Sequence, residues 1–282
     1  MLLSPGTTKE LKIEAQGLAF GYGATPVQHD VSFAVAAGSI FAIMGGSGCG
    51  KSTLMKTMIG LLRPSAGTVQ IRGEDYWAAS DERRDEIGRR SGVLFQAGAL
   101  WSSMSIADNV ALPMRMFTDL EDAAIDRLVR IKLDLVGLDA DGSVMPSDLS
   151  GGMRKRVGLA RALALDPDII FLDEPSAGLD PISARRLDDL ILDLRDGFGT
   201  TVVMVSHELP SLFAICDDGI FLDADTHTPI AHGSPSELRE KCRDPTVHAF
   251  MNRENPATDA PPGNPPGDPN GGSPKARDGA RR

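Results

Sequence analysis

Residues 40–53 read IFAIMGGSGCGKST, an apolar run that leads into a glycine-rich loop. The apolar part predicts a buried strand over residues 40–44, and the part after the loop predicts a helix over residues 51–62, ended by Arg63-Pro64. The loop fits GxxxxGK[ST], a pattern that requires a strand before it and a helix after it. This stretch therefore predicts a phosphate-binding loop within an α/β fold.

The residue types of this loop suit a polyphosphate. Glycines let successive N–H groups curl around an anion without clashes from Cβ atoms, and the helix N-terminus adds positive potential. We expect Lys51 to reach the β- and γ-phosphates, Ser52 to coordinate Mg²⁺ and Thr53 to bond a neighbouring phosphate. The candidate nucleotide-binding residues are Gly45, Gly46, Ser47, Gly48, Cys49, Gly50, Lys51, Ser52 and Thr53, with no chemistry assigned to the Cys49 thiol. The alternative is a glycine-rich turn before an ordinary helix.

The rest of the chain alternates between strands and helices. Apolar and β-branched runs predict strands near residues 11–16, 31–35, 68–72, 92–95, 168–172 and 200–205. Helical spacing of apolar residues predicts helices near residues 106–117, 120–136 and 183–195, with Pro113 kinking or breaking the first. The central helices read as an insertion, and the alternation implies a parallel sheet covered on both faces.

Two acidic residues follow the apolar run 168–172. Asp173 ends the predicted strand, where a phosphate-binding loop needs a second acidic group for its metal ion. Because the chain can turn there, Glu174 can face the γ-phosphate and act as the general base for the attacking water. The alternative is that both acids begin a surface turn before Pro175.

A short motif upstream of these acids points to a family. Leu149-Ser150-Gly151-Gly152 with Met153 resembles the LSGGQ signature of ABC ATPases, with Met in place of the usual Gln. Other landmarks of that family follow in its order: Tyr22 as the aromatic that stacks on adenine, Gln96 as the Q-loop glutamine, residues 176–180 (SAGLD) as the D-loop, and His207 as the switch histidine. Taken singly, Tyr22, Gln96 and His207 have plain alternatives: a packing aromatic, a strand-end amide and a surface imidazole.

The resemblance assigns a role to each matching position. It implies that Glu174, His207 and Gln96 are catalytic, and that Ser52, Gln96 and Asp173 hold Mg²⁺. It further implies ATP contacts from Tyr22, Ser150, Gly151, Gly152 and Asp180.

The resemblance covers roughly residues 11–238 and also implies a fold. It is an α/β fold: a P-loop NTPase (RecA-like) core with a parallel sheet, an N-terminal antiparallel β subdomain and an inserted helical subdomain. We expect one ATPase domain over residues 1–254, with its helical subdomain at about residues 100–165. Residues 255–282 are rich in Pro, Gly, Asn and Asp and hold no large apolar side chain, so we expect a disordered tail.

The signature motif adds a second helix end suited to an anion, since Ser150, Gly151 and Gly152 begin a predicted helix. One ATP per chain does not need two such ends. The family's solution is a head-to-tail homodimer, in which each ATP lies between the loop of one copy and the signature of the other. The cations of residues 154–156 (RKR) fall in the first helical turn, where the helix dipole disfavours positive charge. An anion arriving from the partner would offset this unfavourable interaction. The alternative is plain surface charge.

Within the family, several stretches resemble the ATPases of Mla and related MCE-type phospholipid transporters. They are residues 93–100, 108–113, 149–153 and 178–183, and the Met153 departure is shared with this subgroup. This implies an integral-membrane permease as partner, docked beside Gln96 and the helical segment that follows it. The implied assembly also holds a small regulatory subunit and a lipid-binding MCE protein. It places the chain as a peripheral protein at the cytoplasmic face of the inner (plasma) membrane.

Composition argues against several classes of partner and site. The formal net charge of −10 argues against a nucleic-acid partner, and the three dispersed cysteines form no metal-ligand spacing. No apolar run is long enough to span a bilayer. The remaining alternatives are an ABC ATPase for another cargo (amino acids, metal ions or drugs), a soluble ABC ATPase of DNA repair or translation, and a P-loop kinase. The chain carries one cassette and no long heptad run, which disfavours the second.

Overall fold

The strand of the opening stretch, β3 (Ile40–Gly45), lies inside a six-stranded sheet of the order β10-β9-β3-β8-β7-β6. The computed structural model describes residues 10–23, 25–139 and 141–253. The other strands of this sheet are β6 (Ser91–Leu94), β7 (Ile169–Asp173), β8 (Thr201–Val205), β9 (Asp218–Leu222) and β10 (Pro229–His232). All pairs are parallel except β9 with β10, so the carboxyl ends of β3, β7 and β8 meet at one edge.

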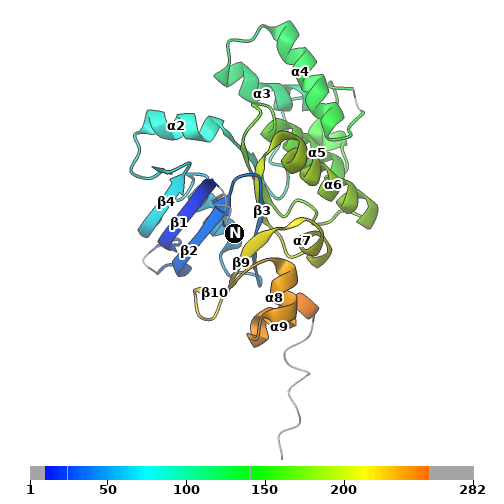
Figure 1. Ribbon diagram of the computed structural model, residues 1–282. Coiled ribbons are helices and arrows are strands. Elements are labelled where there is room, and N and C mark those ends of the chain that lie inside the picture. Colours follow the sequence, from blue (N-terminus) through cyan, green and yellow to red (C-terminus); the bar gives the residue numbers. More distant parts are fainter. Residues whose placement is uncertain (1–9, 24, 140, 254–282) are drawn as a thin grey trace, which may run out of the picture.

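A second, antiparallel sheet has the order β2-β1-β4-β5 and lies on the left of Figure 1. Its strands are β1 (Leu11–Phe20), β2 (Gln28–Ala36), β4 (Ala66–Ile71) and β5 (Glu74–Asp75). One buried cluster joins the two sheets, and within it the ring of Phe33 stacks on that of Phe41, with centroids 5.1 Å apart. The glycine-rich loop is therefore fixed on both sides by packed strands.

Helices cover the parallel sheet and form a separate group at the top of Figure 1. They are α1 (Lys51–Met58), α2 (Asp81–Arg89), α3 (Ile106–Phe117), α4 (Asp122–Leu135), the 3-10 turn η1 (Pro146–Asp148), α5 (Gly151–Ala162), α6 (Pro181–Phe198), α7 (Leu209–Ile215), α8 (Pro235–Lys241) and α9 (Pro245–Asn252). α3 continues through Pro113, so of the two expected effects, a kink or a break, the break does not occur. α1 ends one turn earlier than predicted.

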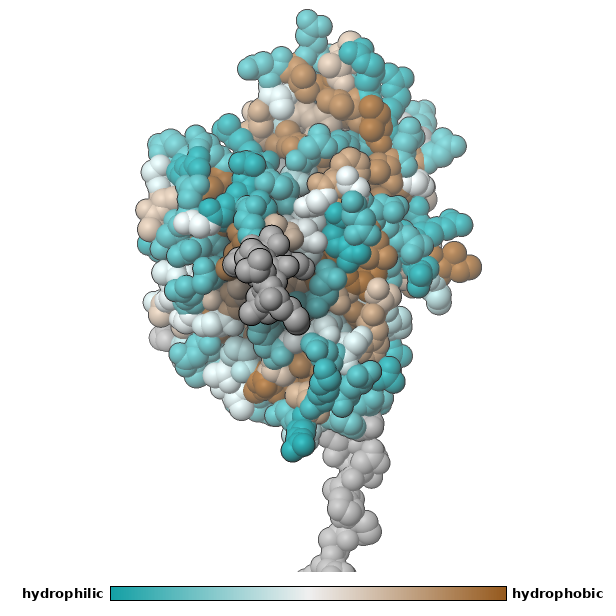
Figure 2. Space-filling model, in the orientation of Figure 1, coloured by the Kyte–Doolittle hydropathy of each residue, from teal (hydrophilic) through white to brown (hydrophobic). Residues whose placement is uncertain are grey.

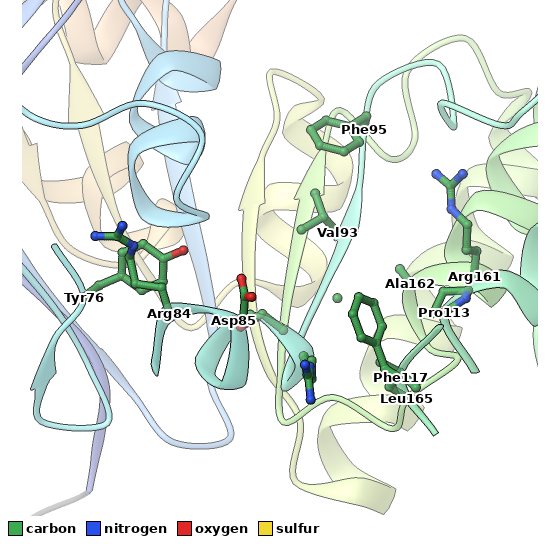
Figure 3. Close-up of a pocket in the computed structure, with 14 residues that line it drawn as sticks. Tyr76, Arg84, Asp85, Val93, Phe95, Pro113, Phe117, Arg161, Ala162 and Leu165 are labelled. Atoms are coloured by element: carbon green, nitrogen blue, oxygen red, sulfur yellow. The ribbon is translucent and has the colours of Figure 1, made fainter. Parts of the chain in front are cut away.

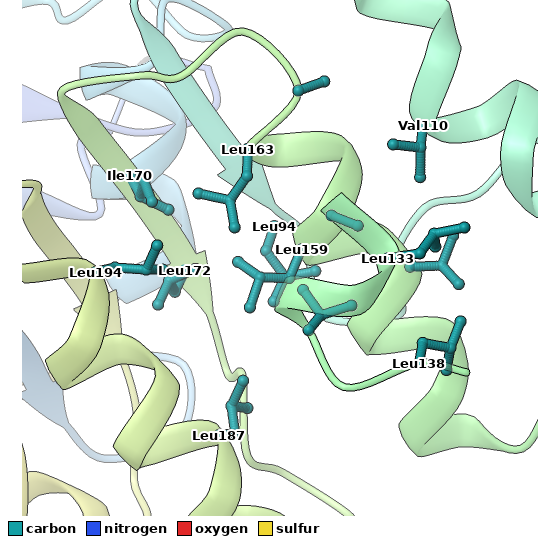
Figure 4. Packing of buried hydrophobic residues seen from close by; sticks show 14 of the residues in the cluster. Leu94, Val110, Leu133, Leu138, Leu159, Leu163, Ile170, Leu172, Leu187 and Leu194 are labelled. Atoms are coloured by element: carbon teal, nitrogen blue, oxygen red, sulfur yellow. The ribbon is translucent and has the colours of Figure 1, made fainter. Parts of the chain in front are cut away.

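α5 is the central piece of the second buried cluster. Its Leu159, and Leu163 at its C-cap, lie between Leu94, Ile170 and the helices that carry Val110 and Leu133 (Figure 4). α5 thus joins the sheet to α3 and α4, and its apolar residues give it little freedom to move alone. A shift of α5 would be felt both in the sheet and in the upper helices.

These observations confirm the predicted fold class: a parallel core sheet, an antiparallel β subdomain and an inserted helical part. No helix in the described ranges has the length and apolarity that crossing a bilayer would require. On the face shown in Figure 2, hydrophobic residues gather mainly in the upper and right-hand parts, where Figure 1 shows helices. The tail expected over residues 255–282 lies outside the described residues.

Candidate functional site

The glycine-rich loop follows β3 directly. The Nζ of Lys51 donates to the carbonyl oxygens of Gly45 at 2.8 Å and Gly46 at 2.7 Å. Gly45 has a φ of 138°, and a Cβ atom there would lie 2.2 Å from the carbonyl oxygen of Leu222, so only glycine fits. Within the described chain, the N–H groups of residues 46–48 donate to no protein acceptor. The loop presents free N–H donors and an ammonium group, which suit a polyphosphate.

α1 continues the loop and adds its N-terminal dipole. Gly50 precedes the helix in a left-handed conformation with φ 99°. The N–H groups of Ser52 and Thr53, in the first turn, have no protein acceptor among the residues the structure covers. The neighbouring thiol of Cys49 is buried, and this burial raises its pKa, so it stays protonated. A protonated, buried thiol fits the absence of chemistry expected at this position.

Folding brings the two candidate magnesium residues together. The hydroxyl of Ser52 donates to Oδ1 of Asp173 at 3.2 Å, across 121 positions of sequence. Burial raises the pKa of Asp173, the Ser52 hydrogen bond lowers it, and the adjacent Glu174 raises it again. A buried carboxylate with an oxygen donor beside it is disfavoured alone and would be stabilised by a cation.

The candidate base lies one residue further on. Glu174 adopts a left-handed conformation with φ 50°, which turns the chain at the end of β7, and its N–H donates to the carbonyl oxygen of Val205 at 2.9 Å. Its Oε1 lies 2.7 Å from Nδ1 of His207. Its Oε2 is buried and has no hydrogen-bond partner within the described residues. This unpaired oxygen is the acceptor that a general base needs.

Gln96 lies two residues beyond β6 on an exposed turn. α5 supports this turn from behind, because Arg161 donates to the carbonyl oxygens of Gly98 at 2.9 Å and Ala99 at 2.8 Å. A Cβ atom on Gly158 would lie 3.0 Å from Gly98, so the turn and the helix are in close contact. The backbone beside Gln96 is therefore held by α5, while the Gln96 side chain makes no hydrogen bond to any residue that the structure describes.

The signature residues begin α5. Ser150 caps the helix, with its Oγ accepting from the N–H of Met153 at 3.2 Å. The N–H groups of Gly151 and Gly152 donate to no protein acceptor in the described part of the chain. They open into a surface depression shared with residues 178–180 and containing none of the glycine-rich loop. Asp180, expected at the nucleotide, caps α6 by accepting from the N–H groups of Ile182 and Ser183, each at 3.0 Å.

Of the three cations after the signature, Lys155 points into the chain, whereas Arg156 lines the signature depression. Lys155 is buried, and its Nζ donates to carbonyl oxygens of the segment after β7. Arg154 donates to the carbonyl oxygen of Leu149 at 2.5 Å, and Arg156 to those of Val136 and Gly137, both at 3.2 Å. Main-chain carbonyl oxygens of the same chain therefore pair all three cations, and for the buried Lys155 they take the place of the expected outside anion.

Tyr22 is 62% exposed, which contradicts the alternative of a packing aromatic. Its hydroxyl accepts from the Nζ of Lys56 at 3.2 Å, and that Nζ lies 5.8 Å from the ring centroid. α1 thus holds an exposed aromatic face beside the glycine-rich loop. Such a face can stack on a base of any identity.

Two groups of candidate residues result. Strand ends and α1 bring together the glycine-rich loop, Asp173, Glu174 and His207, whereas the signature lies in a separate depression. The sequence reasoning missed two supporting residues. The buried Gln28 donates to the carbonyl oxygen of Cys49 at 2.9 Å, and nothing in the sequence indicated it. The role of Lys155 had a signal, since its helical spacing to Leu159 and Leu163 places it on the buried face.

Comparison with known sequences gives a consistent result. The model of the family described as "ABC transporter" matches residues 28–177. The "Probable ribonucleotide transport ATP-binding protein mkl" of Mycobacterium leprae is 40% identical over 240 residues, which cover 85% of this chain and 68% of that protein. The "Intermembrane phospholipid transport system ATP-binding protein MlaF" of Escherichia coli K12 is 40% identical over 239 residues, covering 85% of this chain and 88% of that protein.

Solved structures are similar as well. A dimer of the ATP-binding cassette MJ0796 in a post-hydrolysis state with ADP and Pi superposes with a TM-score of 0.72 at 26% identity, covering 78% of this chain and 97% of that one. The cbiO1 protein of Clostridium perfringens, part of the ABC transporter complex cbiONQ, gives a TM-score of 0.74 at 25% identity, covering 83% and 92%.

Proposed function

This chain belongs to the ABC transporter family, as its nucleotide-binding ATPase subunit, and we propose that two copies close head-to-tail on two Mg-ATP to drive a membrane permease. The observation that carries the proposal is the separation of two sets of free N–H donors in one chain. One set lies at the glycine-rich loop beside Glu174, and the other at the signature depression, which holds no residue of that loop. A second copy is what completes each site, and the dimeric cassettes of similar fold support this arrangement.

Mg²⁺ fits the residues that we propose to hold it. The hydroxyl of Ser52, the carboxylate of Asp173 and the amide oxygen of Gln96 are hard oxygen donors, which Mg²⁺ prefers. Mg²⁺ is usually held by one or two carboxylates together with phosphate oxygens and water, so ATP and water would supply its remaining ligands. When bound, Mg²⁺ supplies charge stabilisation to the phosphates.

We assign the proton transfer of hydrolysis to Glu174. As the oxygen of the attacking water forms its bond to the γ-phosphorus, its proton passes to Oε2, the buried carboxylate oxygen without a partner. The bond from the γ-phosphorus to the β–γ bridging oxygen breaks, which leaves ADP and inorganic phosphate. His207 holds the carboxylate through Oε1 at 2.7 Å, so Oε2 keeps its direction. Lys51 and the loop N–H groups stabilise the charge on the phosphate oxygens.

We propose that the permease docks in a groove of about 480 Å³ between α2, β6 and α3. Figure 3 shows Val93 and Phe95 along its strand side, and Phe117 and Pro113 across from them. The guanidinium of Arg89 lies 5.0 Å from the ring centroid of Phe117. An apolar helix face with an acidic end fits such a lining. Trp101, beyond Gln96, is 59% exposed, so it is not a core residue.

The cargo belongs to the proposal as well. Two relatives of equal identity carry names for different cargo, ribonucleotides and intermembrane phospholipids, so their names alone do not decide. We propose phospholipid, because MlaF matches over 88% of its own length and the stretches at residues 93–100, 108–113 and 178–183 resemble that subgroup. The proposed assembly includes a lipid-binding MCE protein and a small regulatory subunit. It places the chain on the cytoplasmic face of the inner membrane.

The variant Glu174→Gln tests the ATPase and the dimer together. Without the base, hydrolysis should fall on the order of 10²- to 10⁴-fold, and ATP should trap a dimer visible by size-exclusion chromatography. Glu240→Gln, an exposed substitution on α8, is the matched control and should hydrolyse ATP as the wild type does. A Glu174→Gln protein that stays monomeric with Mg-ATP would contradict the proposal.

The cargo and partners need a separate experiment. Proteins that co-purify with the tagged chain from detergent-solubilised membranes should include a permease and an MCE protein. The isolated complex should move fluorescent phospholipid between vesicles in an ATP-dependent way. A complex that instead moves ribonucleotides would overturn the lipid assignment and leave the ATPase assignment intact.

A further inference from the structure

Lys155 lies where α5 crosses the segment that carries Glu174. We propose that Lys155 is a positioning residue, which fixes the Glu174 segment to the same helix whose N-terminus contacts the nucleotide held by the opposite subunit. The inference rests on the proposed function. It goes further by naming the part of the chain through which closure on one nucleotide reaches the base of the other site.

The contacts of Lys155 are directed at one short segment. Its Nζ donates to the carbonyl oxygens of Glu174 at 2.8 Å, Pro175 at 3.2 Å and Ala177 at 2.5 Å. These three acceptors use all three protons of an ammonium group. The side chain is 8% exposed, so water cannot easily replace them. One side chain therefore ties down three of four successive peptide groups in a segment without regular structure.

The backbone of residues 174–177 requires this stabilisation. Glu174 is a non-glycine residue at φ 50°, a conformation that costs free energy and persists only where its surroundings hold it. On its amino side, the N–H of Glu174 bonds to the carbonyl oxygen of Val205. On its carboxyl side, the carbonyl oxygen of Glu174 accepts from Lys155 at 2.8 Å and, over a longer 3.4 Å, from the N–H of Ala177. Without the ammonium group, the carbonyl oxygens of Glu174 and Pro175 would lose a buried donor, and the turn that aims the carboxylate would relax.

The charges around Lys155 agree with this role. Burial lowers the pKa of Lys155, while the nearby carboxylates of Glu174, Asp173 and Glu208 raise it. The ammonium group thus lies behind the acidic residues that face the nucleotide, and contributes positive potential from within the chain. Its hydrogen bonds go to the main chain and not to the carboxylate, so Glu174 keeps its free oxygen.

α5 supplies the mechanical connection. Ser150 caps the helix, and Lys155 follows little more than one turn later. A Cβ atom on Gly152 would lie 3.1 Å from the side chain of Leu179, so the helix end also touches the far part of the same segment. Because α5 is rigid and packed along its length, a shift of its N-terminus moves Lys155 and the segment together. Binding of the opposite nucleotide would thereby set the position of Glu174.

The test compares Lys155→Met, which keeps most of the volume and removes the donors, with Lys155→Arg, which keeps them. The full chain is used, and kcat, KM and ATP-dependent dimerisation are measured. We expect Lys155→Met to lower kcat on the order of 10- to 100-fold through misplacement of the base, with KM and the ATP-bound dimer retained. We expect Lys155→Arg to recover most of the turnover. Lys132→Met removes another buried lysine, paired with Asp166 on the helical side, and should keep the wild-type kcat.

The outcomes separate this inference from the function on which it rests. A wild-type chain that neither hydrolyses ATP nor dimerises with it would overturn both. A wild type that does both, beside a Lys155→Met protein of equal kcat, would overturn only the role of Lys155. Loss of the ATP-bound dimer together with turnover would also overturn it, because Lys155 would then shape the signature rather than the base. If Lys155→Met does not fold, Lys155→Gln is judged by the same two measurements.

Discussion

The hydroxyl of Ser52 donates to the carboxylate of Asp173 at 3.2 Å, although 121 positions separate the two residues. This bond joins the first turn of α1 to the end of β7 and fixes the two oxygens that we propose for Mg²⁺. It exists because β3 and β7 both lie next to β8 and run parallel to it, so α1 begins beside the end of β7.

Asp173→Asn should raise the melting temperature of the nucleotide-free protein near neutral pH and abolish most of the further rise that Mg-ATP gives. Burial raises the pKa of Asp173, so its charged form is disfavoured by folding. For a raised carboxyl pKa, stability falls as pH rises from the unfolded pKa through the folded one, and the loss persists above it. A neutral amide avoids that loss but is a weaker Mg²⁺ ligand. Differential scanning fluorimetry from pH 4 to pH 8 checks both parts, and an unchanged Mg-ATP shift would contradict the metal role.

Ser150→Ala should distinguish the two roles of the Ser150 hydroxyl, as the cap of α5 and as a contact to the partner's nucleotide. Loss of the cap on α5 should lower the free energy of unfolding by about 1 kcal/mol. If Ser150 also contacts the partner's nucleotide, turnover should fall on the order of 10²-fold while the Kd of ATP for the monomer is retained. Ser105→Ala is the matched control, since Ser105 caps α3 in the same way, accepting from the N–H of Asp108. Equal turnover in the two variants would argue against a signature role.

Tyr22→Ala should weaken ATP binding without changing the chemistry. Stacking of a base on an aromatic side chain contributes about 1–3 kcal/mol, so the Kd should rise roughly 5- to 150-fold with kcat preserved at saturating ATP. Stacking does not read base identity, and GTP binding should weaken to a similar degree. Tyr22→Trp should keep the affinity. Isothermal titration calorimetry with ATP and with GTP measures these Kd values. An unchanged Kd for Tyr22→Ala would mean that the nucleotide base does not stack on Tyr22.

Phe117→Glu should disconnect the ATPase from its membrane partner. Phe117 contributes apolar surface to the groove of Figure 3, and a carboxylate there would meet an apolar permease helix at an unfavourable desolvation cost. The isolated variant should hydrolyse ATP normally but fail to pull the permease from solubilised membranes. Phe198→Glu, at the exposed end of α6, is the control and should retain the permease. Retention by Phe117→Glu would mean that the partner docks on another surface.

Local signals predicted a large part of this fold. The strand Ile40–Gly45, the glycine-rich loop and the start of α1 follow from apolar periodicity and from positions where only glycine fits, such as Gly45. α3 was expected over the residues that it occupies. In contrast, β9 and β10 and the helices α2, α7, α8 and α9 were not predicted. Their short apolar runs carry weak periodicity, and tertiary packing rather than local preference decides their structure.

The sequence by itself determined which residues carry the chemistry: the loop at residues 45–53, the acids that end an apolar strand, and a serine-glycine helix start. Each is a local pattern whose spacing is set by one turn or one strand. Only the tertiary structure decided that Lys155 points inward to the carbonyl oxygens of residues 174–177 instead of outward to a partner. Helical spacing identifies the buried face of α5, but the carbonyl oxygens that accept from Lys155 lie 19 to 22 positions away in the sequence. A buried ammonium group donates to the carbonyl oxygens that tertiary packing places within reach, and local sequence does not specify which ones these are.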